Sequence, residues 1–281
     1  MRTAATVSDV RERVAAARAE GARVGFVPTM GFLHEGHLRL VDEARRRSDF
    51  VAMSIFVNPL QFGPTEDFSR YPRDADGDAE KAARCGVDLL FAPAGPEMYD
   101  PRRIVGVVAE GLDRRWEGEA RPGHFAGVLT VVAKLFNIVR PDVAVFGQKD
   151  FQQAALVRAL VRDLDFPIEL VVAPTVRETD GLAMSSRNGY LSAEQRLHAR
   201  ALSRALRALS GRFAGGERDA AVLLAVGRDV LDTEGAIAVD YLAVVDAERL
   251  EPVERAEPGH VVLLAARLGA TRLIDNTILG V

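Results

Sequence analysis

The sequence predicts an α/β fold in which helices flank a parallel β-sheet and a smaller α+β domain follows. Three observations support this fold class. Short apolar runs alternate with helical patterns over the first two-thirds of the chain. Runs such as residues 51–57 are almost continuously apolar, which is typical of strands covered on both faces. After about residue 180, two Ala-, Leu- and Arg-rich helical stretches precede three strand-like runs.

The elements of the first part alternate in a regular order. The strands are predicted at residues 23–28, 50–58, 87–92, 143–146 and 168–173. The helices between them are predicted at residues 36–47, 74–85, 126–139 and 151–164, and the first 20 residues also have a helical pattern. This alternation indicates a parallel sheet joined by right-handed crossovers, in which ligands bind beyond the carboxyl ends of the strands.

The second part has a different pattern. Its helices are predicted at residues 193–211 and 218–233, and its strands at residues 238–245, 260–266 and 271–277. We therefore predict two domains, residues 1–178 and residues 179–281.

Composition excludes several classes of protein. The chain has 36 Lys and Arg residues against 40 Asp and Glu residues, so a general nucleic-acid or anionic-membrane surface is not expected. The single cysteine, Cys85, rules out an intramolecular disulfide and fits a reducing compartment. The apolar runs are shorter than the roughly 18 residues that a membrane span needs. We expect a soluble cytoplasmic protein with no nucleic-acid or membrane partner.

The segment His34-Glu35-Gly36-His37 follows the first predicted strand. A helix that starts there presents backbone N–H groups and the positive end of its dipole, which favour phosphate. His34 and His37 are three residues apart, so they share a face of the first turn. Zinc-binding histidines on a helix are usually four apart. Two alternatives remain at this point, a phosphate site and a surface histidine pair that caps the helix.

Polar side chains also follow two later strands. Asn58 and Gln61 lie after the second, where a simple turn is the alternative. Lys149, Asp150 and Gln153 lie after the fourth, where the alternative is a capped helix with a solvated lysine. A neutral amide among apolar neighbours suits a small hydroxy acid, and a lysine suits a phosphate.

A third polar group follows the fifth predicted strand. Ser185, Ser186 and Arg187 offer two hydroxyls and a guanidinium for a polyphosphate, and a solvated interdomain linker is the alternative. The chain lacks a Walker A loop, a Gly-x-Gly-x-x-Gly fingerprint and a Gly-x-Ser-x-Gly elbow. A P-loop kinase, an NAD-dependent dehydrogenase and a serine hydrolase are therefore disfavoured. The acidic run at residues 74–78 is interpreted as a solvated helix start, so no protein metal ligand is predicted.

Two of these motifs together resemble those of a known superfamily. His34-x-Gly36-His37 and Met184-Ser185-Ser186-Arg187 resemble the HIGH and KMSKS motifs of the adenylate-forming nucleotidyltransferases. More specifically, five blocks resemble the pantothenate synthetase (pantoate–β-alanine ligase) family, at residues 28–37, 56–62, 68–73, 121–128 and 180–188.

The resemblance implies a Rossmann-like N-terminal domain that binds nucleotide and pantoate, a C-terminal lid domain, and a homodimer. It implies that ATP, (R)-pantoate and β-alanine give pantothenate, AMP and pyrophosphate through a pantoyl adenylate, with Mg²⁺ carried mainly by the ATP phosphates. The alternatives are a nucleotidyltransferase of the same superfamily with a different small acceptor, and a catalytically silent nucleotide-binding regulator.

The resemblance also implies roles for individual residues. His34, His37 and Lys149 would be catalytic through the phosphates, with His37 as proton donor. The ATP-binding residues would be Met30, Gly31, Phe32, Leu33, His34, Glu35, Gly36, His37, Gly147, Gln148, Lys149, Asp150, Val176, Met184, Ser185, Ser186 and Arg187. Gln61 and Gln153 would bind pantoate, and Gln61 and Asn58 would bind β-alanine. One departure is visible, because the family usually has glutamate where this chain has Gln148; we expect only modest tuning from it.

Overall fold

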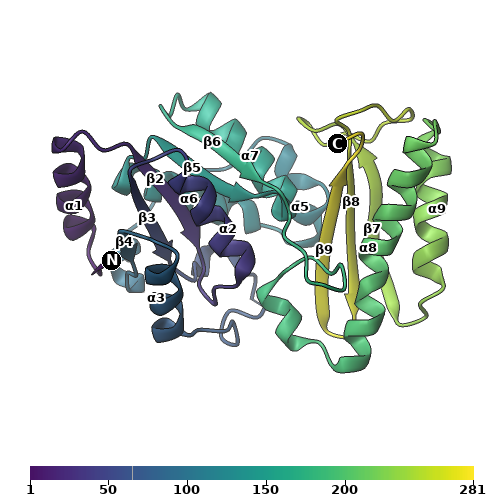
Figure 1. The fold of residues 1–281 in the computed structure, drawn as a ribbon, viewed down its shortest axis with the longest axis horizontal. Helices are drawn as coiled ribbons and strands as arrows, with labels where there is room; N and C mark the ends of the chain where they lie inside the picture. The colour runs from purple at the N-terminus through teal and green to yellow at the C-terminus, as the bar shows by residue number, and fades with distance from the viewer. Residues whose placement is uncertain (65) are drawn as a thin grey trace. The chain divides into compact units, whose positions relative to one another are not determined.

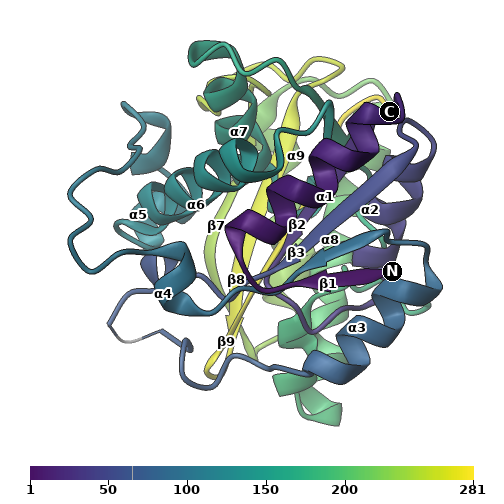
Figure 2. The same ribbon diagram turned by 90° about the vertical axis from the view of Figure 1, so that its left-hand side faces the viewer.

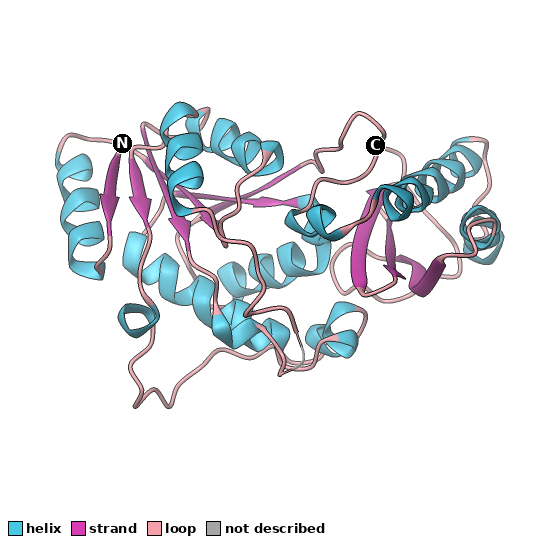
Figure 3. Cartoon of the chain, turned by 90° about the horizontal axis from the view of Figure 1, so that it is seen from below, coloured by secondary structure: helices cyan, strands magenta, loops and turns pink. Residues whose placement is uncertain are grey.

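The computed structural model describes residues 1–64 and 66–281, and the described residues contain two separate sheets (Figure 1 and Figure 3). The first sheet is parallel and has the strand order β1-β4-β3-β2-β5-β6. Its strands are β1 (Arg2–Ala4), β2 (Val24–Thr29), β3 (Phe50–Ile55), β4 (Leu89–Phe91), β5 (Val143–Gly147) and β6 (Glu169–Ala173). The predicted fold class is confirmed.

Helices cover both faces of this sheet, as the continuously apolar strands require (Figure 2). One face packs against α1 (Val7–Ala19), α6 (His124–Val139) and α7 (Phe151–Asp163). The other packs against α2 (Glu35–Arg45) and α3 (Ala75–Arg84). The connections contain shorter helical turns: η1 (Pro59–Gln61), α4 (Gly95–Met98), η2 (Leu112–Arg114), α5 (Glu117–Ala120), η3 (Gln148–Asp150) and η4 (Ser186–Tyr190).

Two predicted elements differ from the structure. The helical pattern assigned to the first 20 residues begins only at Val7, because residues 2–4 form β1 and pair with β4. Three residues are too few to reveal a strand by periodicity. The strand predicted to reach residue 58 ends at Ile55, because Asn58 caps the 3₁₀ turn η1, in which Pro59 takes the first position.

The second sheet is antiparallel, with the order β7-β8-β9. Its strands are β7 (Ile237–Val245), β8 (Val261–Leu268) and β9 (Thr271–Ile278), and α8 (Ala193–Ala214) and α9 (Ala220–Asp232) share a core with it. Helix α8 starts with a capping box in which Ser192 and Gln195 each accept a hydrogen bond from the other's backbone N–H.

The chain forms two compact units. The first comprises Met1–Gly147 and Leu156–Ala173, and the second comprises Gln148–Ala155 and Pro174–Val281. Gln148–Ala155 thus groups with the C-terminal residues by contact, and the domain boundary predicted after residue 178 stays a prediction. Among the described residues, no helix is both long and apolar enough to cross a membrane.

Candidate active site

The paired histidines lie where β2 turns into α2. His34 is the N-cap residue of α2, with extended backbone angles, and His37 lies in the first turn. The ring centroids are 4.1 Å apart. The His34 N–H donates to His37 Nδ1 at 3.3 Å, and the His37 N–H donates to the His34 carbonyl at 2.8 Å. The two rings are therefore held side by side at the start of a helix, as the spacing predicts.

The loop before His34 is fixed by a carboxylate that we interpreted as solvated. Asp78 in α3 is buried, and its two oxygens accept the N–H groups of Phe32 at 2.7 Å and Leu33 at 2.6 Å. Gly31 has φ +83°, and a Cβ there would lie 2.9 Å from Asp78 Oδ2. Only glycine fits this turn without strain. The interpretation of residues 74–78 as a wholly solvated helix start is thus wrong for Asp78.

A sequence signal for Asp78 did exist. In α3 it lies on the stripe that also contains Ala79 and Ala82, which pack toward the sheet. A single carboxylate on an apolar helix face needs partners, because an unpaired buried charge is costly. The partners are the backbone N–H groups of the β2–α2 loop. Two of the loop's donors are consequently occupied within the protein.

The Gln61 side chain lies in a buried setting after β3. Its Nε2 lies 3.1 Å from the sulfur of Met30, and its Oε1 accepts from Asn58 Nδ2 at 3.0 Å. A thioether sulfur is a weak acceptor. The Gln61 amide therefore has its oxygen fixed by a good hydrogen bond and its nitrogen held only weakly.

The Asn58 amide, by contrast, is fully used within the protein. Besides Gln61, its nitrogen donates to the Gly127 carbonyl at 3.1 Å. Its oxygen accepts from the Leu60 N–H at 3.2 Å and from the Tyr99 hydroxyl at 2.8 Å. Burial raises the pKa of Tyr99 to about 12, so the phenol stays protonated and donates. Asn58 thus fixes the Gln61 oxygen, and it is itself fixed from three sides.

The backbone of Gln61 is held by a second polar group. His124 Nδ1 lies 2.8 Å from the Gln61 carbonyl, and Arg121 Nη2 donates to the same oxygen at 3.3 Å. Arg121 also forms a bidentate ion pair with Glu66: Nη2 donates to Oε2 at 2.6 Å and Nε donates to Oε1 at 3.0 Å. Figure 2 shows α6, which starts at His124, beside the short α5 in this part of the first unit.

His124 is neutral in this environment. Burial and, to a smaller extent, the Arg121 guanidinium together lower its pKa to about 4, against a smaller opposing effect of the Gln61 carbonyl. Arg121 Nη1 lies 3.0 Å from Nε2, so Nε2 is the acceptor and Nδ1 carries the proton that Gln61 accepts. Sequence reasoning included Arg121 and His124 in a motif but gave them no role.

The backbone of α6 at Gly127 packs directly against the backbone of η1, with no side chain between them. A Cβ built on Gly127 would lie 2.2 Å from the Leu60 carbonyl oxygen and 2.6 Å from the Gln61 nitrogen. Because no side chain stands between them, the Asn58 amide can reach the Gly127 carbonyl. Gly127 therefore sets the position of the turn that carries Gln61.

Apart from Gly147, which ends the first unit's β5, the other predicted site residues lie in the second unit. Lys149 lies in η3 with a half-buried side chain, and its Nζ is 3.9 Å from Asp150 Oδ2. Gln153 follows in the first turn of α7. The Met184 N–H donates to the Val176 carbonyl at 3.0 Å, so these two predicted nucleotide-binding residues are adjacent.

The serine and arginine group forms the start of η4. Ser185 is the N-cap residue and accepts the Arg187 N–H at 3.3 Å, and Ser186 is buried. The preceding segment is anchored by Arg196, which pairs with both Glu178 and Asp180. The candidates thus divide between the two units, and Gly147 ends β5 directly before the residues of the second unit.

The described residues hold no group of three or more His, Cys, Asp and Glu side chains arranged for a metal ion.

Comparison with known proteins assigns these groups to one family. The model of the pantoate–β-alanine ligase family matches residues 2–278. The pantothenate synthetase of Moorella thermoacetica is 54% identical over 276 residues, which are 98% of each chain. The crystal structure of pantothenate synthetase from Thermus thermophilus has a TM-score of 0.94 and 50% identity, and covers 99% of both chains.

A further solved structure has bound ligands. It is the pantoate–β-alanine ligase of Francisella tularensis complexed with β-γ ATP and β-alanine, with a TM-score of 0.81 and 30% identity over 99% of this chain and 97% of that one. The family match, the relatives and the two solved structures agree along almost the whole sequence. This chain belongs to the pantoate–β-alanine ligase family.

Proposed function

We propose that this chain condenses (R)-pantoate with β-alanine, using ATP, to give pantothenate, AMP and pyrophosphate. The observation that carries the proposal is the family match over residues 2–278, within which all the candidate residues lie. The Francisella ligase, complexed with β-γ ATP and β-alanine, supports the same pair of ligands here.

In the first step the pantoate carboxylate attacks the α-phosphorus of ATP, and pyrophosphate leaves. Negative charge builds on the phosphate oxygens, so fixed donors and cations at that place lower the barrier. His34 and His37, paired at the start of α2, contact the phosphates, and His37 supplies a proton. Lys149 adds a point charge, and Ser185, Ser186 and Arg187 bind the β and γ end.

The remaining nucleotide contacts come from backbone and from the β2–α2 loop. The Met30–Leu33 turn lies against the nucleotide in the shape that Asp78 imposes. Gly147 and Val176 line the nucleotide site with their main chains, and Asp150 accepts hydrogen bonds from the ribose hydroxyls.

Gln61 and Gln153 bind pantoate. The weak contact between Gln61 Nε2 and the Met30 sulfur is readily exchanged for a substrate oxygen, which is a far better acceptor. The Gln61 oxygen stays on Asn58, so the nitrogen is presented in a fixed direction. Preorganisation of this kind lowers the entropy cost of binding.

In the second step the β-alanine amine attacks the acyl carbon of the pantoyl adenylate. The amide bond forms, the bond to the AMP phosphate breaks, and the amine loses its proton. Gln61 orients β-alanine as well as pantoate. Because its amide is fully used, Asn58 contributes to β-alanine binding through Gln61.

Mg²⁺ would reach the site bound to the ATP phosphates. Mg²⁺ commonly keeps several waters and binds through substrate phosphates, so ATP would supply most of its ligands. When bound, the ion would neutralise charge on the departing pyrophosphate. Asp150, whose Oδ2 lies 3.9 Å from Lys149 Nζ, would contact a magnesium-bound water.

We also propose a homodimer that acts in the cytoplasm, where a reducing environment suits the single cysteine. The support for a dimer is an apolar strip in the first unit: Ile104 is 95% exposed, Val105 75% and Val108 70%. Thr130 accepts the Val107 N–H at 2.9 Å and turns that residue inward. Sedimentation of the Ile104→Glu/Val108→Glu variant should show monomer, while Leu197→Glu on exposed α8 should not change the assembly.

The reaction is tested by exchange of labelled pyrophosphate into ATP with pantoate present and β-alanine absent. Pantoate-dependent exchange is expected, followed by AMP and pantothenate when β-alanine is added. Folded protein that binds ATP without exchange would indicate a different acceptor or a silent regulator, and would overturn the proposal.

A further inference from the structure

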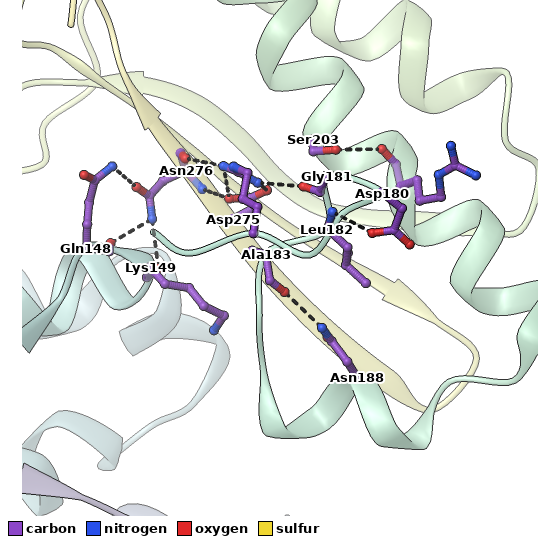
Figure 4. A network of polar contacts seen from close by, with 12 residues as sticks. Gln148, Lys149, Asp180, Gly181, Leu182, Ala183, Asn188, Ser203, Asp275 and Asn276 are labelled. Atoms are coloured by element: carbon purple, nitrogen blue, oxygen red, sulfur yellow. Dashed lines mark hydrogen bonds and ion pairs between the residues drawn. The ribbon is translucent and has the colours of Figure 1, made fainter. Parts of the chain in front are cut away.

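Asn276 in β9 holds the turn that carries Lys149. Its side-chain nitrogen donates to the Gln148 carbonyl at 3.0 Å and to the Lys149 carbonyl at 2.8 Å. Figure 4 shows the Asn276 side chain directed at this turn. Asn276 is buried, and both of its N–H donors are used on two successive peptide carbonyls.

The orientation of this amide is determined by its partners. Two carbonyl oxygens require the nitrogen on that side, so the Asn276 oxygen faces away from them. That oxygen accepts from Gln148 Nε2 at 3.1 Å. Asn276 therefore contacts the Gln148–Lys149 segment through three hydrogen bonds, two of which do not depend on the side chain at 148.

The strand position of Asn276 is itself supported. The neighbouring Asp275 is buried and receives two hydrogen bonds from Arg177, at 2.7 and 2.9 Å. Asp275 also accepts the Asn276 N–H at 2.8 Å. Arg177 donates to the Gly181 carbonyl at 3.2 Å, and thereby ties the loop that leads to Ser185 to the same strand.

We infer that Asn276 is a positioning residue for the Lys149 ammonium group in the first half-reaction. It contacts no reacting atom. By fixing two consecutive peptides it fixes the Cα of Lys149, and so limits the volume that a long, flexible side chain can sample. The inference rests on the proposed function, because it assigns Lys149 to the phosphates.

The size of the expected rate loss follows from how strongly catalysis depends on the position of the catalytic group. A displacement of about 1 Å in a catalytic group can cost about 100-fold in rate. Asn276→Asp keeps the shape and the acceptor but loses both donors and places a carboxylate against two carbonyls. We expect pantoate-dependent pyrophosphate exchange to fall by about 10- to 100-fold, with the KM for pantoate changed less than kcat.

A double-mutant cycle with Lys149→Ala tests the inference. If Asn276 acts through Lys149, Asn276→Asp should lower the rate by less than about threefold in the Lys149→Ala background, because coupled residues are not additive. Equal losses in both backgrounds would overturn the inference, as would a normal rate for Asn276→Asp alone. Asn137→Asp is the matched control, since Asn137 is exposed on α6 and bonds only to Ala133 of its own helix in the contacts described.

Two further measurements separate the possible failures. If Asn276→Asp does not fold, as shown by circular dichroism, the same cycle is run with Asn276→Ser, which retains one donor. Exchange by the unaltered chain is measured first. If the unaltered chain shows no exchange, the proposed function is refuted. The double-mutant cycle is then measured by ATP affinity instead of exchange rate, and it still tests whether Asn276 acts through Lys149.

Discussion

Replacing Gly127 with alanine should displace the turn that carries Gln61. The added Cβ would lie 2.2 Å from the Leu60 carbonyl oxygen and 2.6 Å from the Gln61 nitrogen, where ordinary contacts begin at 3.4 Å. Backbone atoms cannot rotate away, so α6 and η1 must separate by about 1 Å, which typically costs about 1–3 kcal/mol. Alanine recovers up to about 1 kcal/mol through its higher helix propensity.

A second glycine gives the matched control. Gly211 lies in α8, is exposed, and has open space around a built Cβ. Gly211→Ala should therefore stabilise the protein by up to about 1 kcal/mol, because only the helix propensity changes. The same substitution in two helices should thus change the free energy of unfolding in opposite directions.

The assays are denaturant unfolding followed by circular dichroism, and initial rates at varied pantoate and ATP. We expect Gly127→Ala to lower stability and to reduce kcat/KM for pantoate by about 10- to 100-fold, since a shift of about 1 Å misplaces the Gln61 amide. The ATP parameters should change less. A Gly127→Ala protein as stable as Gly211→Ala, with normal pantoate kinetics, would refute this account of the α6–η1 contact.

Three other predictions concern single side chains. His37→Ala and Lys149→Ala should each lower turnover by about 100-fold or more with the fold intact by circular dichroism, and near-normal turnover in both would remove them from the phosphate site. Gln61→Ala should raise the KM for pantoate far more than that for ATP in initial-rate measurements; equal increases of the two KM values would contradict its place in the acid site. His124 has a folded pKa of about 4 against 6.5 in the unfolded chain, so the unfolded state binds more protons between these values. Stability should therefore fall as pH drops through that window, by up to about 3 kcal/mol, and His124→Asn should flatten this dependence in unfolding curves.

Hydrophobic periodicity and the residues at element ends were sufficient to predict the fold class and most of its helices and strands. The strands β2, β3, β5 and β6 are mainly apolar runs, and each is confirmed within a few residues. The strand β1 was missed because its pairing with β4, more than 80 residues away, leaves no local trace.

The sequence places His34, His37 and Gln61 directly after strand ends, and the structure has them there, at the start of α2 and in η1. Their roles toward substrate stay predictions. Asp78 differs from the prediction because a carboxylate in a helix start is normally solvated. Its place on the apolar face of α3 was a signal of burial, but its backbone partners, the N–H groups of Phe32 and Leu33, are seen only in the structure. Arg121 and His124 act on a main-chain carbonyl, which no pattern of side chains reveals.

The effect of the residue at position 148 could not be predicted from sequence either. From sequence, Gln148 in place of glutamate removed a charge beside Lys149, and we expected modest tuning. In the structure the Gln148 side chain donates one hydrogen bond to Asn276. The other two bonds that hold this turn run from the Asn276 side chain to backbone carbonyls, and they do not depend on the side chain at 148. Gln148→Glu should therefore have a smaller effect than Asn276→Asp, a ranking that needs the long-range contact to be known.

The bond between Asn276 and Lys149 has a consequence for the order of events during synthesis. The two residues are 127 positions apart, and Asn276 belongs to the last strand of its sheet. Domains fold largely from the N-terminus as they leave the ribosome. The parallel sheet can thus form while the lysine turn still lacks its partner, and a nascent chain should gain ATP-dependent protection from protease only after β9 emerges. Protection of chains stalled before β9 would show that the turn is ordered without it.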